Sequence, residues 1–307
     1  MLGPTTFPGK RDAMADTTDR RLRAGTDNGW RRFWDRGGWW RAVLAVVAYL
    51  AVYTGVGWLS AHTVGRGVTG DILSSPGNVV LGLALPILVM GILTLAFVRS
   101  LGWQREVFGR QPIAGRGWMW IAVALLLVPV VVRVVATNWS AYSVAVVFAV
   151  LFLGLCIGFT EELIARGVAV TLLRRGHHSE RVVALLSSLL FGLMHATNAI
   201  SGANPLTVLL TVVYTFGIGV MLYLSMRVTG SIVPAILLHA ATDPTTILAT
   251  GGIDGQSATS GGAGLIAFAG VFNILYPVLG LLALFLIKGC VDARRDVDDA
   301  ASVGQGV

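Results

Sequence analysis

The chain of 307 residues is too apolar for a soluble protein. Hydrophobic residues make up 55% of it, charged residues make up 13%, and its mean hydropathy is +0.74, whereas a soluble domain carries about 25% charged residues. The net charge of +7 does not indicate nucleic-acid binding, because the basic residues lie at the ends of apolar runs. There they orient membrane spans and meet anionic lipid headgroups.

In chain order, residues 1–38 are polar and Gly-rich, and we expect them to form a disordered cytoplasmic arm. Eight apolar runs follow, each about the length that crosses a bilayer. They are Trp40–Ala61, Val79–Val98, Trp118–Ala136, Tyr142–Phe159, Val182–Ile200, Leu206–Met226, Ile232–Ala249 and Gly264–Ile287. The fourth run is expected to continue as helix through Leu173. The sequence therefore predicts an all-α bundle of about eight transmembrane helices over residues 39–288, with a polar cytoplasmic tail at 289–307.

The Lys and Arg residues of the loops predict that both termini lie in the cytoplasm. Alternate loops are rich in Arg, whereas the loops between them carry one basic residue, Arg66. The chain has 21 Arg and 2 Lys, with abundant Ala, Gly and Val, a composition typical of a GC-rich genome. We expect a multi-pass protein of a bacterial plasma membrane.

Three polar clusters interrupt the apolar runs, and ionisable residues inside a membrane are costly and usually functional. They are Thr160–Arg166 in the fourth run, Phe191–His195 in the fifth and His239–Asp243 in the seventh. In each cluster, polar or aromatic side chains lie four residues apart and share one helix face. The spacing predicts that Glu162 pairs with Arg166 and that Phe191 braces His195, while His239 and Asp243 project side by side. Three helices would then direct Glu, His and Asp side chains at one point.

Two kinds of chemistry fit such a cluster. A carboxylate in a desolvated site can act as a general base, with one histidine sharing the proton and a second holding an oxyanion. Alternatively, His195 and His239 could bind zinc at an open catalytic site, with Glu162 or Asp243 as the carboxylate ligand. A single buried Glu–Arg pair is more often structural, and a single membrane histidine is about as often a helix–helix hydrogen bonder as a catalytic group. The catalytic prediction therefore depends on the three clusters together.

The remaining ionisable residues of the spans and their flanks are expected to lie outside this site. His177 and His178 belong to an Arg-rich connection, and His62 begins a loop on the far side. Arg133, near the end of the third run, is expected to extend its side chain toward the membrane surface.

The ordered motifs EExxxR, FxxxH and HxxxD resemble those of the CPBP family, the CAAX protease and bacteriocin-processing family. In this chain they begin at Glu161, Phe191 and His239, within a region of about residues 144–250. The resemblance implies an intramembrane endopeptidase, of metallo or glutamate type. It implies that Glu161 and His195 activate water and that His239 and Asp243 form the oxyanion site. Glu162, Arg166 and Phe191 would support this catalytic group.

Position 243 departs from the prenyl-CAAX endopeptidases, which have Asn there. An ionised Asp cannot donate a hydrogen bond to an oxyanion. The departure leaves open both the role of Asp243 and whether the substrate is prenylated.

The predicted function is therefore hydrolysis of a peptide bond in a protein or peptide in or at the membrane. The lipid bilayer is the expected surroundings, and no nucleic-acid partner is expected. One alternative is a non-catalytic membrane scaffold or bacteriocin-immunity factor. A second is a proton-coupled transporter, in which the same residues would relay protons.

Overall fold

A computed structural model describes residues 29–68, 71–200, 202–252 and 262–291. Within these ranges the chain folds into helices and forms no strand, and eight helical segments are long and apolar enough to cross a membrane. The predicted fold class and the eight predicted runs are confirmed. Helix boundaries differ from the predicted ones by a few residues, because the sequence pattern marks the apolar part of a helix and not its caps.

The eight spans include both continuous and composite helices. The continuous ones are α3 (Trp39–His62), α11 (Pro205–Thr229), α12 (Ile232–Thr250) and α13 (Ala263–Leu286). Two spans include a 3₁₀ turn: α7 (Trp120–Ala136) follows one, and α10 (Glu180–Met194) precedes one. The second span joins α4 (Pro76–Val79) through a π-helical turn to α5 (Leu85–Leu101). The fourth runs from α8 (Val144–Glu162) through the π-helical segment Leu163–Ala169 into α9 (Val170–Arg175), which confirms its predicted continuation past Phe159.

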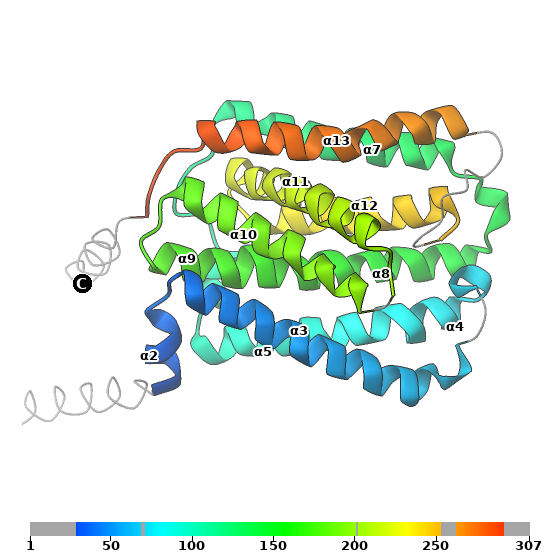
Figure 1. Cartoon of the computed structure of the whole chain (residues 1–307), viewed down its shortest axis with the longest axis horizontal. Coiled ribbons are helices and arrows are strands. Elements are labelled where there is room, and N and C mark those ends of the chain that lie inside the picture. Colours follow the sequence, from blue (N-terminus) through cyan, green and yellow to red (C-terminus); the bar gives the residue numbers. More distant parts are fainter. Residues whose placement is uncertain (1–28, 69–70, 201, 253–261, 292–307) are drawn as a thin grey trace, which may run out of the picture.

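The helices that carry the three polar clusters lie at the centre of the bundle. Figure 1 shows α8–α9, α10, α11 and α12 between the pair α3 and α5 on one side and the pair α7 and α13 on the other. In the most apolar 18-residue stretch of α12, 61% is buried by protein, against 22% in the corresponding stretches of α3 and α13. The outer helices therefore shield the polar clusters from lipid.

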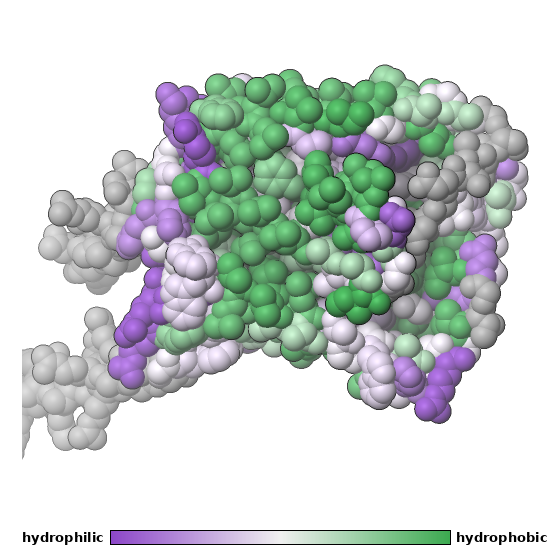
Figure 2. Space-filling view, in the orientation of Figure 1, coloured by the Kyte–Doolittle hydropathy of each residue, from purple (hydrophilic) through white to green (hydrophobic). Residues whose placement is uncertain are grey.

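The two ends of the described chain lie at the same end of the bundle, the end at which α10 begins (Figure 1). A broad apolar surface covers the middle of the face in Figure 2, with hydrophilic residues gathered toward the ends. This distribution is typical of a protein whose middle lies in the hydrocarbon layer.

We expect reporter fusions to place both termini in the cytoplasm, because the Arg-rich loops alternate with loops that are almost free of basic residues. Fusions after Ser140 and Gly202 should report the outer side, and a fusion after Gly176 should report the cytoplasm. Enzymatic reporters that are active on only one side of the membrane make the measurement. A cytoplasmic signal at both Ser140 and Gly202 would contradict the orientation.

A short helix, α2 (Gly29–Asp35), forms inside the segment predicted to be a disordered arm. Trp34 is buried, and the Asp35 carboxylate accepts a hydrogen bond from the Trp103 indole and pairs with Arg175. These tertiary contacts offset the entropy that ordering a short polar segment costs. Residues 1–28 of the predicted arm, and the tail from residue 292, lie outside the described residues.

Close packing of α8 against α12 brings the first and third polar clusters together. Gly154 and Gly158 lie one turn apart on the face of α8 that meets α12. A Cβ atom added at Gly158 would lie 2.6 Å from the Ile236 carbonyl oxygen and 2.7 Å from the Ala240 nitrogen. Small residues at this spacing let two membrane helices approach closely. The glycines thus set the distance between Glu162 and His239.

Candidate active site

The ion pair predicted between Glu162 and Arg166 lies at the centre of the site. Arg166 Nη1 is 2.8 Å from Glu162 Oε1, and neither side chain is exposed. Arg166 Nη2 also donates to the Gly219 carbonyl oxygen of α11 at 2.8 Å. The guanidinium therefore ties α8 to α11 while it compensates a carboxylate buried in the bundle.

His239 of α12 meets the same carboxylate from the other side. Its Nδ1 lies 3.0 Å from Glu162 Oε1, a geometry in which Nδ1–H donates to the carboxylate and turns Nε2 toward the cavity. Only 6% of this side chain is exposed. Glu162 thus orients His239, as the carboxylate of a Ser-His-Asp triad orients its histidine.

Phe191 joins the three clusters into one structure. Its ring packs edge-to-face against His195, with centroids 5.2 Å apart, and against His239 at 5.7 Å. The Arg166 guanidinium lies over the same ring, 4.4 Å from its centroid. The predicted contact between Phe191 and His195 is present, and Phe191 supports both imidazole rings.

Glu161 lies between the two histidines. Its Oε2 is 4.0 Å from His195 Nε2 and 3.9 Å from His239 Nε2, separations that one bridging water spans. Oε2 is enclosed and has no hydrogen-bond partner among the described residues. His195 Nδ1 lies 3.1 Å from the Phe191 carbonyl oxygen, which can accept a hydrogen bond from Nδ1–H, so Nε2 presents a lone pair to Glu161.

His195 does not lie inside an α-helix. It follows the last residue of α10 and begins a 3₁₀ turn, His195–Ala199. A π-helical segment likewise follows Glu162 directly. Irregular turns of this kind concentrate at functional sites, because they redirect side chains that a regular helix would hold elsewhere.

Asp243 lies at the edge of the group. Its Oδ2 is 3.6 Å from His239 Nε2, and 35% of its side chain is exposed. The structure therefore brings together Glu161, Glu162, His195 and His239, with Asp243 beside them.

The donor atoms do not fit a zinc ion well. In the described part of the chain, no group of three or more His, Cys, Asp or Glu side chains is arranged to hold a metal. The carboxylate–imidazole separations of 3.6–4.0 Å exceed the ~3.3 Å expected between the ligands of a tetrahedral zinc with bonds of about 2.0 Å. Nδ1 of His239, moreover, is engaged by Glu162.

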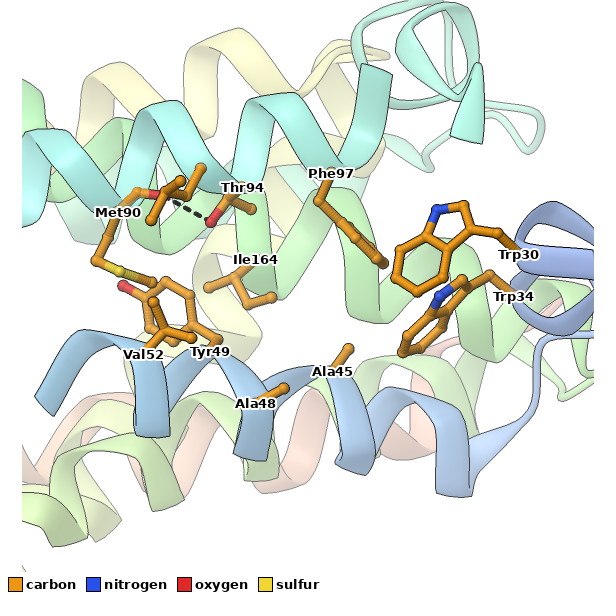
Figure 3. Close-up of a pocket in the computed structure, with 11 residues that line it drawn as sticks. Trp30, Trp34, Ala45, Ala48, Tyr49, Val52, Met90, Thr94, Phe97 and Ile164 are labelled. Atoms are coloured by element: carbon orange, nitrogen blue, oxygen red, sulfur yellow. Dashed lines mark hydrogen bonds between the residues drawn. The ribbon is translucent and has the colours of Figure 1, made fainter. Parts of the chain in front are cut away.

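Two larger cavities adjoin the small cavity of about 90 Å³ that borders Glu161 and His195. An apolar pocket of about 340 Å³ lies between α2, α3 and α5, and Figure 3 shows Trp30, Trp34 and Phe97 together at one end of it and Tyr49 and Met90 at the other. A wider cavity of about 500 Å³ lies beyond Tyr53. Tyr49 lines both the apolar pocket and the Glu161 cavity, so the two spaces meet at this side chain.

The other three histidines lie away from this group. His177 and His62 are exposed, and His178 is half-buried in the connection between α9 and α10. Arg133, in contrast, does not extend to the membrane surface as expected: it is only 6% exposed. Helical side chains lean toward the N-terminus of their helix, which directs Arg133 back into the bundle.

Tyr49 and Tyr53 are site-lining residues that the sequence analysis did not identify. They lie one turn apart on α3, with their rings stacked at 6.2 Å, and both border the Glu161 cavity. Their spacing of four residues in an apolar run was an available signal. It does not stand out, because tyrosines are also common at membrane interfaces.

A second buried network also lacked a sequence signal. Glu180 accepts two hydrogen bonds from Arg174 and one each from Tyr223 and Arg227. It joins the α9–α10 connection to α11. Arg174 and Arg227 therefore have structural partners, in addition to supplying the positive charge of their loops.

The fold is that of an integral membrane protein, and its central helices bring two glutamates and two histidines together. Residues 142–245, about a third of the chain, match the family model described as type II CAAX prenyl endopeptidase Rce1-like. This match supports the CPBP, or CAAX protease, family that the motifs predict. No curated protein and no solved structure matches the chain.

Proposed function

We propose that this protein is an intramembrane endopeptidase that hydrolyses a peptide bond with water activated by Glu161 and His195. The observation that carries the proposal is the enclosed Oε2 of Glu161, which faces the Nε2 atoms of two histidines at 3.9 and 4.0 Å. Both histidines are oriented through their Nδ1 atoms, so their Nε2 atoms are free for chemistry. The match to CAAX endopeptidases supports this reaction class.

The reaction begins with a water molecule between Glu161 and His195. Glu161 takes one proton as the water oxygen attacks the carbonyl carbon of the scissile bond. The carbonyl oxygen becomes negatively charged and accepts a hydrogen bond from Nε2 of a protonated His239. Glu162 accepts from Nδ1 of the same ring and holds it in place. Asp243 borders this oxyanion position.

The tetrahedral intermediate then breaks its carbon–nitrogen bond. The proton held by Glu161, shared with His195, passes to the leaving nitrogen, so the products are a carboxylic acid and an amine. Glu161 returns to its ionised state. Arg166 and Phe191 do not touch the substrate in this scheme; they position Glu162 and the two rings.

The apolar pocket indicates an apolar group close to the scissile bond. It is lined mainly by aliphatic and aromatic side chains, and Tyr49 separates it from Glu161. We propose that the substrate places a hydrophobic side chain or a hydrocarbon chain there, with its peptide passing Tyr53 into the wider cavity. Burial of such a group would supply binding energy beside the reacting bond.

We expect Ala48→Trp to lower kcat/KM tenfold or more, because its indole would fill the apolar pocket and the buried apolar group is worth about 1.5–3 kcal/mol. Val47→Trp is the matched control, since Val47 lies on the same helix but is 55% exposed and does not line the pocket. The measurement is cleavage by both purified variants. Equal activity in the two variants would remove the pocket from the binding site.

Comparison of membrane proteomes tests the function itself. Cells with the wild-type protein should contain a peptide terminus that disappears in cells with Glu161→Ala at equal abundance of the protease. No difference between the two proteomes, together with a normal phenotype of the variant, would favour the scaffold or immunity alternative. A proton flux in liposomes that needs Glu161 would instead favour a transporter.

A further inference from the structure

Arg133 is a buried cation that the proposed mechanism does not use. It lies three residues before Ala136, the last residue of α7, at the end of the bundle that is far from α2 (Figure 1). Only 6% of the residue is exposed. Its Nη1 is enclosed and has no hydrogen-bond partner in the part of the chain that the structure describes. A charged group in this situation is expensive inside a membrane unless an opposite charge lies close by.

Tyr214 of α11 connects Arg133 to the site. Its hydroxyl lies within electrostatic range of both the Arg133 guanidinium and the Asp243 carboxylate. Its ring also packs against Tyr276 of α13, with centroids 5.9 Å apart, and Tyr276 in turn lies near Arg133. Because α7 packs against both α11 and α12, the helices that carry Arg133, Tyr214 and Asp243 adjoin one another.

The depth of the residues in the bundle agrees with this grouping. The C-terminal ends of α7 and α12 lie at the same end of the bundle (Figure 1). At a rise of 1.5 Å per residue, Arg133 lies about 4 Å from the end of α7 and Asp243 about 10 Å from the end of α12. The Arg133 side chain leans toward the N-terminus of α7, which points it inward to the level of Asp243. Its length covers the difference in depth.

The other acidic residues of the described spans have their own cationic or histidine partners, which makes Asp243 the candidate partner of Arg133. The described spans contain four acidic residues, Glu161, Glu162, Glu180 and Asp243. Glu162 pairs with Arg166, Glu180 pairs with Arg174 and Arg227, and Glu161 faces the two histidines. Among the carboxylates of the described spans, Asp243 is the one whose sole ion-pair contact is with a histidine, His239, and it lies toward the same end of the bundle as Arg133 (Figure 1).

We propose that Arg133 is the counter-ion of Asp243 and acts as a positioning residue for the site. Its charge balances the carboxylate, so that Asp243 can remain beside His239 without repelling the negative oxygen of the intermediate. The catalytic part of this role depends on the proposed function, whereas the electrostatic pairing does not. The positive charge of Arg133 therefore balances an ionised Asp243, which would otherwise have to be protonated to carry no net charge.

The test is a double-mutant cycle with Arg133→Met and Asp243→Asn in the full-length protein. Each single variant leaves one charge without its counter-ion, and we expect it to lower the melting temperature by at least about 4 °C. The double variant has neither charge and should recover most of this loss. Arg133→Lys keeps the charge and should stay close to the wild type, whereas Arg99→Met, at an exposed position on α5, should change little.

Cleavage gives the second readout. Arg133→Met should lower kcat at least tenfold when Asp243 is present, because the carboxylate then opposes the oxyanion, and should have little further effect in the Asp243→Asn background. Equal effects of Arg133→Met on stability and on kcat in both backgrounds would overturn the proposal. If no substrate is cleaved by any variant, the peptidase function fails while the melting temperatures still decide the pairing. If Arg133→Met does not fold, the ability of Asp243→Asn to restore folding decides it.

Discussion

Glu161→Gln should reduce peptide cleavage by about 10²–10⁴-fold, the usual contribution of a general base. Gln has nearly the same shape as Glu but cannot take a proton from water. Glu161 forms no ion pair with Arg166, and its Oε2 has no hydrogen-bond partner among the described residues. Its replacement therefore breaks no direct hydrogen bond of Oε2, and the abundance and melting temperature of the variant should stay close to those of the wild type.

The double variant His177→Ala/His178→Ala is the control for this prediction. Both residues lie in the α9–α10 connection, outside the group around Glu161, and activity should remain within about twofold of the wild type, a difference of roughly 0.4 kcal/mol in the barrier. Cleavage by the purified proteins, each measured with and without a metal chelator, makes the comparison. Full activity of Glu161→Gln would exclude Glu161 as the base, and chelator-sensitive activity would assign the reaction to a metal-dependent mechanism.

The fold was predictable because the membrane leaves few alternatives. Backbone groups in hydrocarbon must be satisfied within the segment, so each apolar run of about 20 residues becomes a helix. The sequence does not mark the irregular parts in the same way. The π-helical segment after Glu162, the 3₁₀ turn at His195 and the short helix α2 depend on contacts between distant residues.

The side-chain clusters were predictable from helical spacing, but the partners between helices were not. Spacing of four residues placed Glu162 with Arg166 and Phe191 with His195. It could not show that Glu162 also receives His239, because that contact depends on how closely α8 and α12 approach. For the same reason Arg133, near the end of an apolar run, was expected at the membrane surface, whereas neighbouring helices bury it.

Arg166→Met should have the largest effect on stability among single substitutions in the site. The loss of one partner from a buried ion pair costs about 3–5 kcal/mol, because the other charge stays buried. Glu162 is not exposed at all, so in this variant its charge would be balanced by His239 alone. The expected result is a fall in melting temperature on the order of 10 °C and a lower abundance in the membrane, together with loss of cleavage.

Three further variants separate the charge of Arg166 from its geometry. Arg166→Lys keeps the charge, but its ammonium cannot reach both Glu162 and the Gly219 carbonyl oxygen in the planar arrangement of a guanidinium, so it should recover part of the stability. Adding Glu162→Gln to Arg166→Met removes both charges and should also recover stability. It should not recover cleavage, because His239 then faces a neutral amide in place of the carboxylate that orients it. Arg99→Met, on the exposed end of α5, provides the baseline for removing a surface arginine. A stable and active Arg166→Met would mean that the Glu162 carboxylate does not need this cation. The Glu162–Arg166 ion pair would then contribute little to the stability of the protein or to cleavage.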